Sequence, residues 1–140
     1  SATGRDTDEA MESAIAWSRL GYTRTQVNEA TRVSLMAAND AQISAGEATK
    51  YLSSITQVYN LSAHDLTGVL GQVVNTANKY NVTVSDLLNG MSKVAPMARQ
   101  AGLGLSELQG MIGAAVGSTG QTGSMIGNAL KTVMVRLSQP

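Results

Sequence analysis

The residues that could carry out chemistry in this chain are few and lie far apart. His64 is the one histidine, cysteine is absent, and no two of the ten acidic residues have a spacing suited to acid–base catalysis. A catalytic histidine needs a nucleophile and an orienting partner, and no pattern around His64 and Asp65 marks either. We therefore interpret His64 as a solvated residue in a first helical turn, and we expect neither a catalytic site nor a metal site.

Two glycine-rich segments have some features of nucleotide-binding loops, and both fail the full pattern. Residues 117–123 read Gly-Ser-Thr-Gly-Gln-Thr-Gly, but a phosphate-binding loop needs lysine directly after its last glycine, where this chain has Ser124. Gly102 and Gly104 lack the third glycine of the dinucleotide fingerprint, since Glu107 takes that place, and no strand precedes them. We expect no cofactor and no enzymatic activity.

Composition limits the partners and the domain count. Charged residues make up 14% of the 140 residues and the formal net charge is zero, against about 25% charged residues in typical soluble proteins. No basic cluster follows a phosphate backbone, so specific nucleic-acid binding is not expected. The length suits one helical domain over residues 1–140. Because the chain begins with Ser1, we expect a fragment of a longer protein. Residues 1–4 should be either a flexible end or a short segment added to the natural sequence.

A short capping pattern recurs along the chain and predicts where helices begin. An apolar residue is followed by Ser or Thr and then, about three positions on, by an acidic residue. The hydroxyl accepts a hydrogen bond from a free helix amide, and the carboxylate lies near the positive end of the helix dipole. The pattern occurs at Ser44/Glu47, Ser62/Asp65 and Thr83/Asp86, in a degenerate form at Tyr22-Thr23, and compressed at Leu105-Ser106-Glu107.

These caps, at 23, 44, 62, 83 and about 104, predict an all-α fold. We expect a compact bundle of about six to seven short antiparallel helices with capped starts and a glycine-rich hairpin near the C-terminus. The first helix should begin at Asp6, with Glu9 completing its cap, and Pro96 should kink the fifth helix or end it early. The expected helices span about 6–20, 25–40, 45–59, 63–80, 84–101, 105–116 and 123–138.

The C-terminal third combines apolar residues with regularly spaced glycines. No charged residue occurs from Leu108 to Leu130, and glycines stand at 110, 113, 117, 120, 123 and 127. On one side of a helix they would let a second backbone come close, yet each glycine inside a helix costs about 1 kcal/mol relative to alanine. We therefore predict two helices separated by a break at 117–123. The second would place Met125, Ala129, Leu130, Val133, Met134 and Leu137 on its apolar face.

The same segment resembles a known family. Its motif reads Ala101-Gly-Leu-Gly-Leu-Ser-Glu-Leu108, then Ile112-Gly113, Gly123-Ser124, Gly127-Asn-Ala-Leu-Lys131 and Arg136-Leu-Ser-Gln-Pro140. This order resembles the core region of phage tail tape measure proteins, with Asn128 where threonine is usual. The resemblance covers 102–140. It implies structural roles, not binding roles, for Gly102, Gly123, Gly127, Ala129, Leu130, Arg136, Leu137 and Pro140, with Leu130 and Leu137 in the core.

The resemblance also implies a function, a location and partners. It points to a structural segment of a tape measure protein from a tailed phage, prophage or phage-tail-like particle, acting in tail assembly, tail-length determination and genome ejection. The implied location is the virion tail interior, with the host cytoplasm during assembly. The implied partners are the tail tube, tail assembly chaperone and tail-tip or baseplate proteins, together with self-association in the tail lumen.

Two other functions stay open at this point. The uncharged stretch is long enough to span a bilayer and contains Gly-x-x-x-Gly pairs, so residues 105–138 could form a membrane-active, pore-forming hairpin that aids DNA delivery. Its polar centre at 118–122 favours a buried hairpin instead. Alternatively, the chain is a generic helical adaptor that binds a partner helix through grooves of Met, Ala and Gly.

Overall fold

The computed structural model describes the backbone of residues 2–138 and the side chains of residues 7–137. Over this part the chain is helical and contains no strand, so the predicted all-α bundle is confirmed. A 3₁₀ turn, η1 (Ala63–Asp65), leads directly into the fourth helix. The α-helices are α1 (Ala2–Ser18), α2 (Arg24–Ala41), α3 (Ala45–Tyr59), α4 (Leu66–Tyr80), α5 (Val84–Gln100), α6 (Leu105–Thr119) and α7 (Gly123–Ser138).

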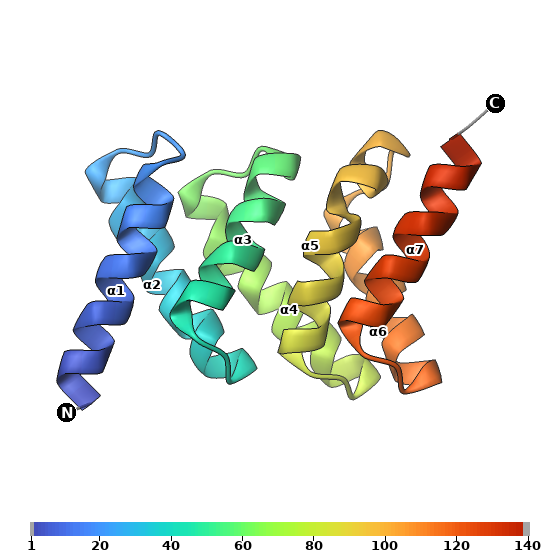
Figure 1. Ribbon diagram of the computed structural model, residues 1–140, viewed down its shortest axis with the longest axis horizontal. Coiled ribbons are helices and arrows are strands. Elements are labelled where there is room, and N and C mark those ends of the chain that lie inside the picture. Colours follow the sequence, from blue (N-terminus) through green and yellow to red (C-terminus); the bar gives the residue numbers. More distant parts are fainter. Residues whose placement is uncertain (1, 139–140) are drawn as a thin grey trace.

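The helices form two layers (Figure 1). The odd-numbered helices lie side by side in front, where α3 packs between α1 and α5, and α7 packs on α5. Behind them α4 packs between α2 and α6. Helix α5 lies at the centre of the packing, since it contacts α2, α3, α4, α6 and α7. The chain therefore advances from one end of the array to the other, with its described N- and C-terminal helices far apart.

Between residues 19 and 122 the connections repeat one backbone design. Each contains a residue with positive φ, which ends the preceding helix: Gly21, Gln42, Asn60, Asn81, Gly102 and Gly120. The next residue is apolar in all but the last connection, where Gln121 takes its place. In four of them its amide donates to the carbonyl five residues back, as Val82 does to Ala77 at 2.9 Å, which satisfies a free helix-end carbonyl.

The residue two positions after the left-handed one caps the following helix, as the sequence pattern predicts at 23, 44, 62 and 83; the cap at Thr122 has no acidic residue three positions on and was not predicted. Hydroxyl caps accept from the backbone amide three residues on, with donor–acceptor distances of 3.0 to 3.3 Å, at Thr23, Ser44, Ser62, Thr83 and Thr122. The connection before α6 is different. Gly104 is the cap residue, and the Glu107 carboxylate accepts from its amide at 3.1 Å. Ser106 therefore lies inside α6, and our reading of it as a compressed hydroxyl cap is wrong.

Two other helix boundaries differ from the prediction, those of α1 and α6. Helix α1 begins at Ala2, so Asp6 lies within a helix instead of capping one. Helix α5 ends at Gln100, close to its expected end at about 101, so it does not end early at Pro96. Helix α6 continues to Thr119, so the break is confined to residues 120–122. Thr119 supports this extra turn because its hydroxyl donates to the Ala115 carbonyl at 2.6 Å.

The core is a continuous set of small and medium side chains with one large anchor. Trp17 is fully buried, stacks on Tyr22 with ring centroids 5.7 Å apart, and donates its indole N–H to the Ser34 hydroxyl at 2.8 Å. Buried alanines, among them Ala30, Ala48 and Ala95, let neighbouring helices approach closely. The apolar positions of α4 and α5, such as Leu66, Leu87 and Val94, are buried in the core, whereas Val74 is half-buried.

Glycines set the closest helix contacts, those of α7 on α5. A Cβ atom at Gly123 would overlap the Asp86 carbonyl oxygen, and one at Gly127 would lie 3.1 Å from the Lys93 side chain and 3.3 Å from the Gly90 Cα. On α6, Gly113 and Gly117 make comparably close contacts with Tyr80. Gly110 has no atom within 4 Å of such a Cβ. Close packing is therefore confirmed at four of the six spaced glycines and is absent at Gly110 and Gly120.

Tyrosine hydroxyls join neighbouring connections at one edge of the array. Tyr22 donates to the Leu61 carbonyl at 3.2 Å, and Tyr59 donates to the Leu103 carbonyl at 3.0 Å. Burial raises the pKa of both phenols, and the negative charge of Asp65 raises that of Tyr22 further. For Tyr59, the charge of Arg99 lowers the pKa and that of Glu107 raises it, with burial as the largest effect.

Replacing glycine by alanine should have opposite effects at 123 and 110. Gly123→Ala should lower the free energy of unfolding by about 1–3 kcal/mol, because α7 must move away from the α5 backbone. Gly110→Ala should raise it by about 0.5–1 kcal/mol, because an unobstructed helical site gains helix propensity. Thermal and urea unfolding followed by circular dichroism measure both. A neutral Gly123→Ala would contradict the close α5–α7 contact.

Alkaline pH should unfold the protein partly through its tyrosines. Because folding raises these two pKa values above the ordinary value of 10.0, their contribution to stability is complete below pH 10 and is lost as pH rises through the folded-state values. Tyr22→Phe/Tyr59→Phe should be less stable at pH 7, since each lost hydrogen bond costs about 0.5–1.5 kcal/mol, and should lose less stability above pH 10. Equal alkaline slopes in urea unfolding would refute the assignment.

Candidate assembly surface

The structure does not assemble the described titratable side chains into a reactive site. His64 lies in η1 with its side chain 92% exposed, and its Nδ1 is 3.4 Å from the Glu29 carboxylate. This confirms the solvated position predicted for it. Within residues 7–137 no group of three or more His, Asp or Glu side chains is placed to hold a metal ion.

The family-motif residues on α6 and α7 take unequal positions. Gly102 has φ +83° and ends the preceding helix, whereas Gly123 and Gly127 make the close contacts with α5. Leu130 is half-buried. Leu137 is 80% exposed, so the prediction that Leu137 lies in the core is wrong within the part of the chain that the structure describes. Ala129 and Arg136 are exposed, and Pro140 lies outside the described residues.

Asp86 anchors α7 to α5, a role that the sequence analysis missed. One carboxylate oxygen accepts from the Thr83 hydroxyl at 2.9 Å, and the other accepts from the Gly123 amide at 2.8 Å. Gly123 is the first residue of α7, so the same carboxylate lies at the positive dipole ends of two helices. The sequence marks Asp86 as part of a cap on α5. Its second bond depends on a residue 37 positions away, so the local pattern contains no signal for it.

An apolar groove lies between the C-terminal ends of α5 and α7. It has a volume of about 330 Å³ and is lined by Met97, Gln100, Ala101, Met134, Val135 and Leu137. Three further apolar side chains of α7 differ in how far they are buried. Ile126 is buried, whereas Met125 and Val133 are about half exposed, with exposed fractions of 53% and 50%. Ile126 was not among the residues expected on the apolar face of this helix.

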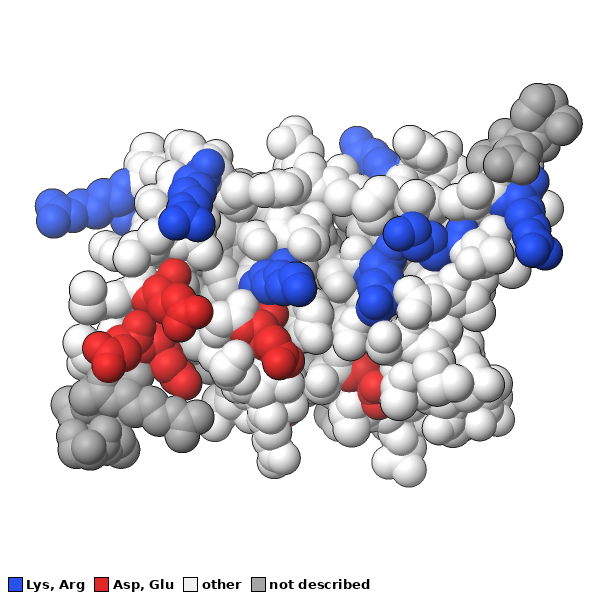
Figure 2. Space-filling view, viewed as in Figure 1, with Lys and Arg blue, Asp and Glu red and all other residues white. Residues whose placement is uncertain are grey.

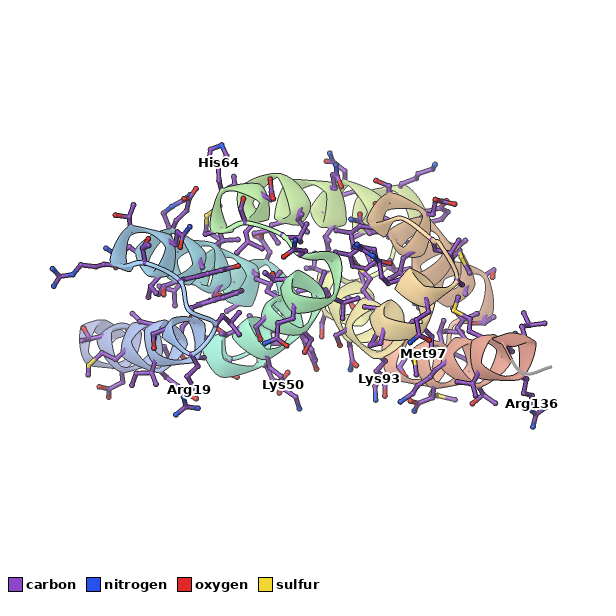
Figure 3. The ribbon with its side chains drawn as sticks, turned by 90° about the horizontal axis from the view of Figure 1, so that it is seen from above. Arg19, Lys50, His64, Lys93, Met97 and Arg136 are labelled. Atoms are coloured by element: carbon purple, nitrogen blue, oxygen red, sulfur yellow. The ribbon has the colours of Figure 1, made fainter. Side chains whose placement is uncertain are left out.

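The front layer carries its charges in two bands. Basic side chains spread across the upper half of this face and acidic ones across the lower half (Figure 2). Arg19, directly after the end of α1, points out on the same side as Lys50, Lys93 and Arg136 of α3, α5 and α7 (Figure 3). Glu47 and Asp86 lie in the first turns of α3 and α5, and Arg99 and Arg136 lie in the last turns of α5 and α7, so these charges complement the helix dipoles.

Some apolar side chains of residues 105–138 are buried in the core, and others are exposed at the surface. Leu108, Ile112 and Val116 of α6 are buried in the core. Among the described residues, no helix combines the length and apolar character needed to cross a bilayer. The arrangement is suited to helix–helix assembly, because close glycine contacts, an open groove and exposed aliphatic side chains meet at one end of the array.

Comparisons with known proteins agree with this description. The chain is 28% identical over 134 residues to a tape measure protein of Pneumococcus phage Dp-1, covering 94% of this chain and 12% of that protein. It is 27% identical over 139 residues to a probable tape measure protein of Escherichia phage P2, covering 99% of this chain and 17% of that protein. No solved structure matches the chain.

The chain thus spans a small part of the length of the curated relatives that it matches. A family model for phage-related minor tail proteins matches residues 1–140, the whole of the chain. This match agrees with the resemblance carried by residues 102–140 and extends it over all seven described helices. The chain belongs to the phage-related minor tail protein family, with a structural role in the phage tail.

Proposed function

We propose that this chain is a helical segment of a longer tape measure protein and contributes to tail-length determination. The observation that carries the proposal is the pair of tape measure relatives, which it matches along nearly its whole length while covering 12% and 17% of theirs. A ruler needs repeated structure that adds length in proportion to residue number. The regular succession of short helices supplies such repetition.

The fold is compatible with two states, a compact array and an extended chain of helices. As a continuous helix, 140 residues would reach about 210 Å, whereas a compact domain of this size has a radius of gyration near 15 Å. Gln42, Asn60 and Asn81 can all adopt helical conformations in place of their left-handed one. Contacts through Gly and Ala also bury less apolar area than contacts through large side chains, so separating the hairpins costs less.

The proposed location follows from this role. The segment is folded in the host cytoplasm before assembly and lies extended inside the tail tube afterwards, where it leaves before DNA passes during genome ejection. Its partners are then the tail tube, a tail assembly chaperone and the tail-tip or baseplate proteins, with further copies of itself in the lumen. The two charge bands of the front layer give such partners a polar face to recognise.

Removing one helical hairpin tests the ruler role. Deleting residues 44–82 from the parent gene joins Ile43 to Thr83 and so keeps the left-handed residue, apolar residue and hydroxyl cap in the new connection. Since 39 residues of extended helix span about 60 Å, tails should shorten by about that length, and a tandem duplication of 44–82 should lengthen them equally. Electron microscopy of particles measures both.

The length-neutral variant Gly110→Ala serves as the control and should leave tail length unchanged. If particles with the deletion and the duplication both assemble with tails of unaltered length, the segment does not contribute to the ruler. If the two changes shift the length in the same direction, impaired assembly explains the result, and the proposal fails as well.

A further inference from the structure

The hydroxyl caps of α3, α5 and α7 are equally spaced along the chain, so the three helices can be aligned residue by residue. We call this alignment their register. Ser44, Thr83 and Thr122 each accept from the amide three residues on, and they are spaced by 39 residues. All three helices lie in the front layer (Figure 1). Residues at equal distances from these caps therefore occupy equivalent positions, and their burial can be compared directly.

In α3 and α5 the equivalent positions in the middle turns of the helix are buried. The positions 8, 11 and 12 residues after the cap are fully or almost fully buried in both helices. They are Leu52, Ile55 and Thr56 in α3, and Met91, Val94 and Ala95 in α5. Each of these helices has neighbours on both sides within the front layer, α1 and α5 for α3, and α3 and α7 for α5.

Helix α7 has the same apolar pattern in sequence, but its later apolar side chains are not fully covered by other helices within the described part of the chain. Its first turns follow the register, since Gly123, Ile126 and Gly127 are buried against the array. The later core positions are Leu130, Val133 and Met134; Leu130 and Met134 are half-buried and Val133 is 50% exposed. Leu137, equivalent to the half-buried Tyr59 of α3 and the fully buried Ala98 of α5, is 80% exposed. The groove of about 330 Å³ beside Met97 opens along this side.

We propose that α7 is the first helix of a further hairpin, and that the next helical hairpin of the same polypeptide packs on Leu130, Val133, Met134 and Leu137. The inference rests on the proposed function, since it requires a longer protein. The register supplies the argument for this occupant, because α7 repeats the core pattern of helices that are covered by later parts of the chain. The tape measure relatives have ample additional length to supply it.

A second copy of the chain is the competing occupant. Helix α1 at the opposite end exposes Met11 and Ile15 and could stack on α7 of another molecule. A segment joined by a short connection has an effective concentration in the millimolar range, which a free copy reaches only in concentrated solution. The continuous chain is therefore the favoured partner for α7.

Hydrogen exchange distinguishes these occupants. The 140-residue chain is compared with a chain extended by about 40 residues of the parent gene, one further hairpin long. Covering these aliphatic side chains should slow exchange of the amides at 130–137 by about tenfold or more in the extended chain. Val133→Asp should remove this protection. Asn128→Asp, the matched control, adds the same charge at an exposed position whose equivalent Lys50 is also exposed, and should retain it.

Three results would overturn the inference. The first is equal exchange at 130–137 in the two chains, and the second is equal protection in the Val133 and Asn128 variants. The third is protection that appears in the 140-residue chain and grows with its concentration, which would assign the surface to a second copy. Tail length in particles lacking 44–82 is a separate readout. Unchanged tails with a protected α7 would refute the ruler role and leave this inference standing.

Discussion

The reversal of the chain within a few residues at each connection is the constraint on which the array depends. A left-handed residue ends one helix, an apolar residue turns back toward the core, and the next residue caps the following helix. This design satisfies free carbonyls and free amides at the same place, so a short connection leaves few unpaired backbone groups. Its repetition makes successive helices antiparallel and of similar length, which in turn lets them stack as two layers.

Small residues then determine how closely the layers pack. Where α7 approaches α5, glycine stands on both helices, and an Asp86 carboxylate bonds to the first amide of α7. Such an interface is specific in shape but modest in buried apolar area, in contrast to the N-terminal end, where Trp17 fills the core. Contacts of this kind suit the change between a compact array and an extended chain that we propose, because they are exact in geometry and moderate in energy.

Family membership and structure support each other at different levels. The family match covers the whole chain, whereas the sequence motif concentrates at 102–140. The structure gives the motif residues a packing role: Gly102 follows the end of α5, Gly123 and Gly127 dock α7 on α5, and the apolar positions after them continue the spacing of α3 and α5. Such a motif specifies packing between helices, and no reactive group takes part in it.

The sequence by itself determined the local structure of this protein. Hydroxyl caps, the acidic residues after them and the apolar spacing located nearly every helix, because these signals act within one or two turns of the chain. It did not determine contacts between distant residues. The bond from Gly123 to Asp86, the burial of Ile126 and the exposure of Leu137 depend on which helices become neighbours. An apolar position in α7 looks the same in sequence whether or not another helix covers it, and only the tertiary structure decides that.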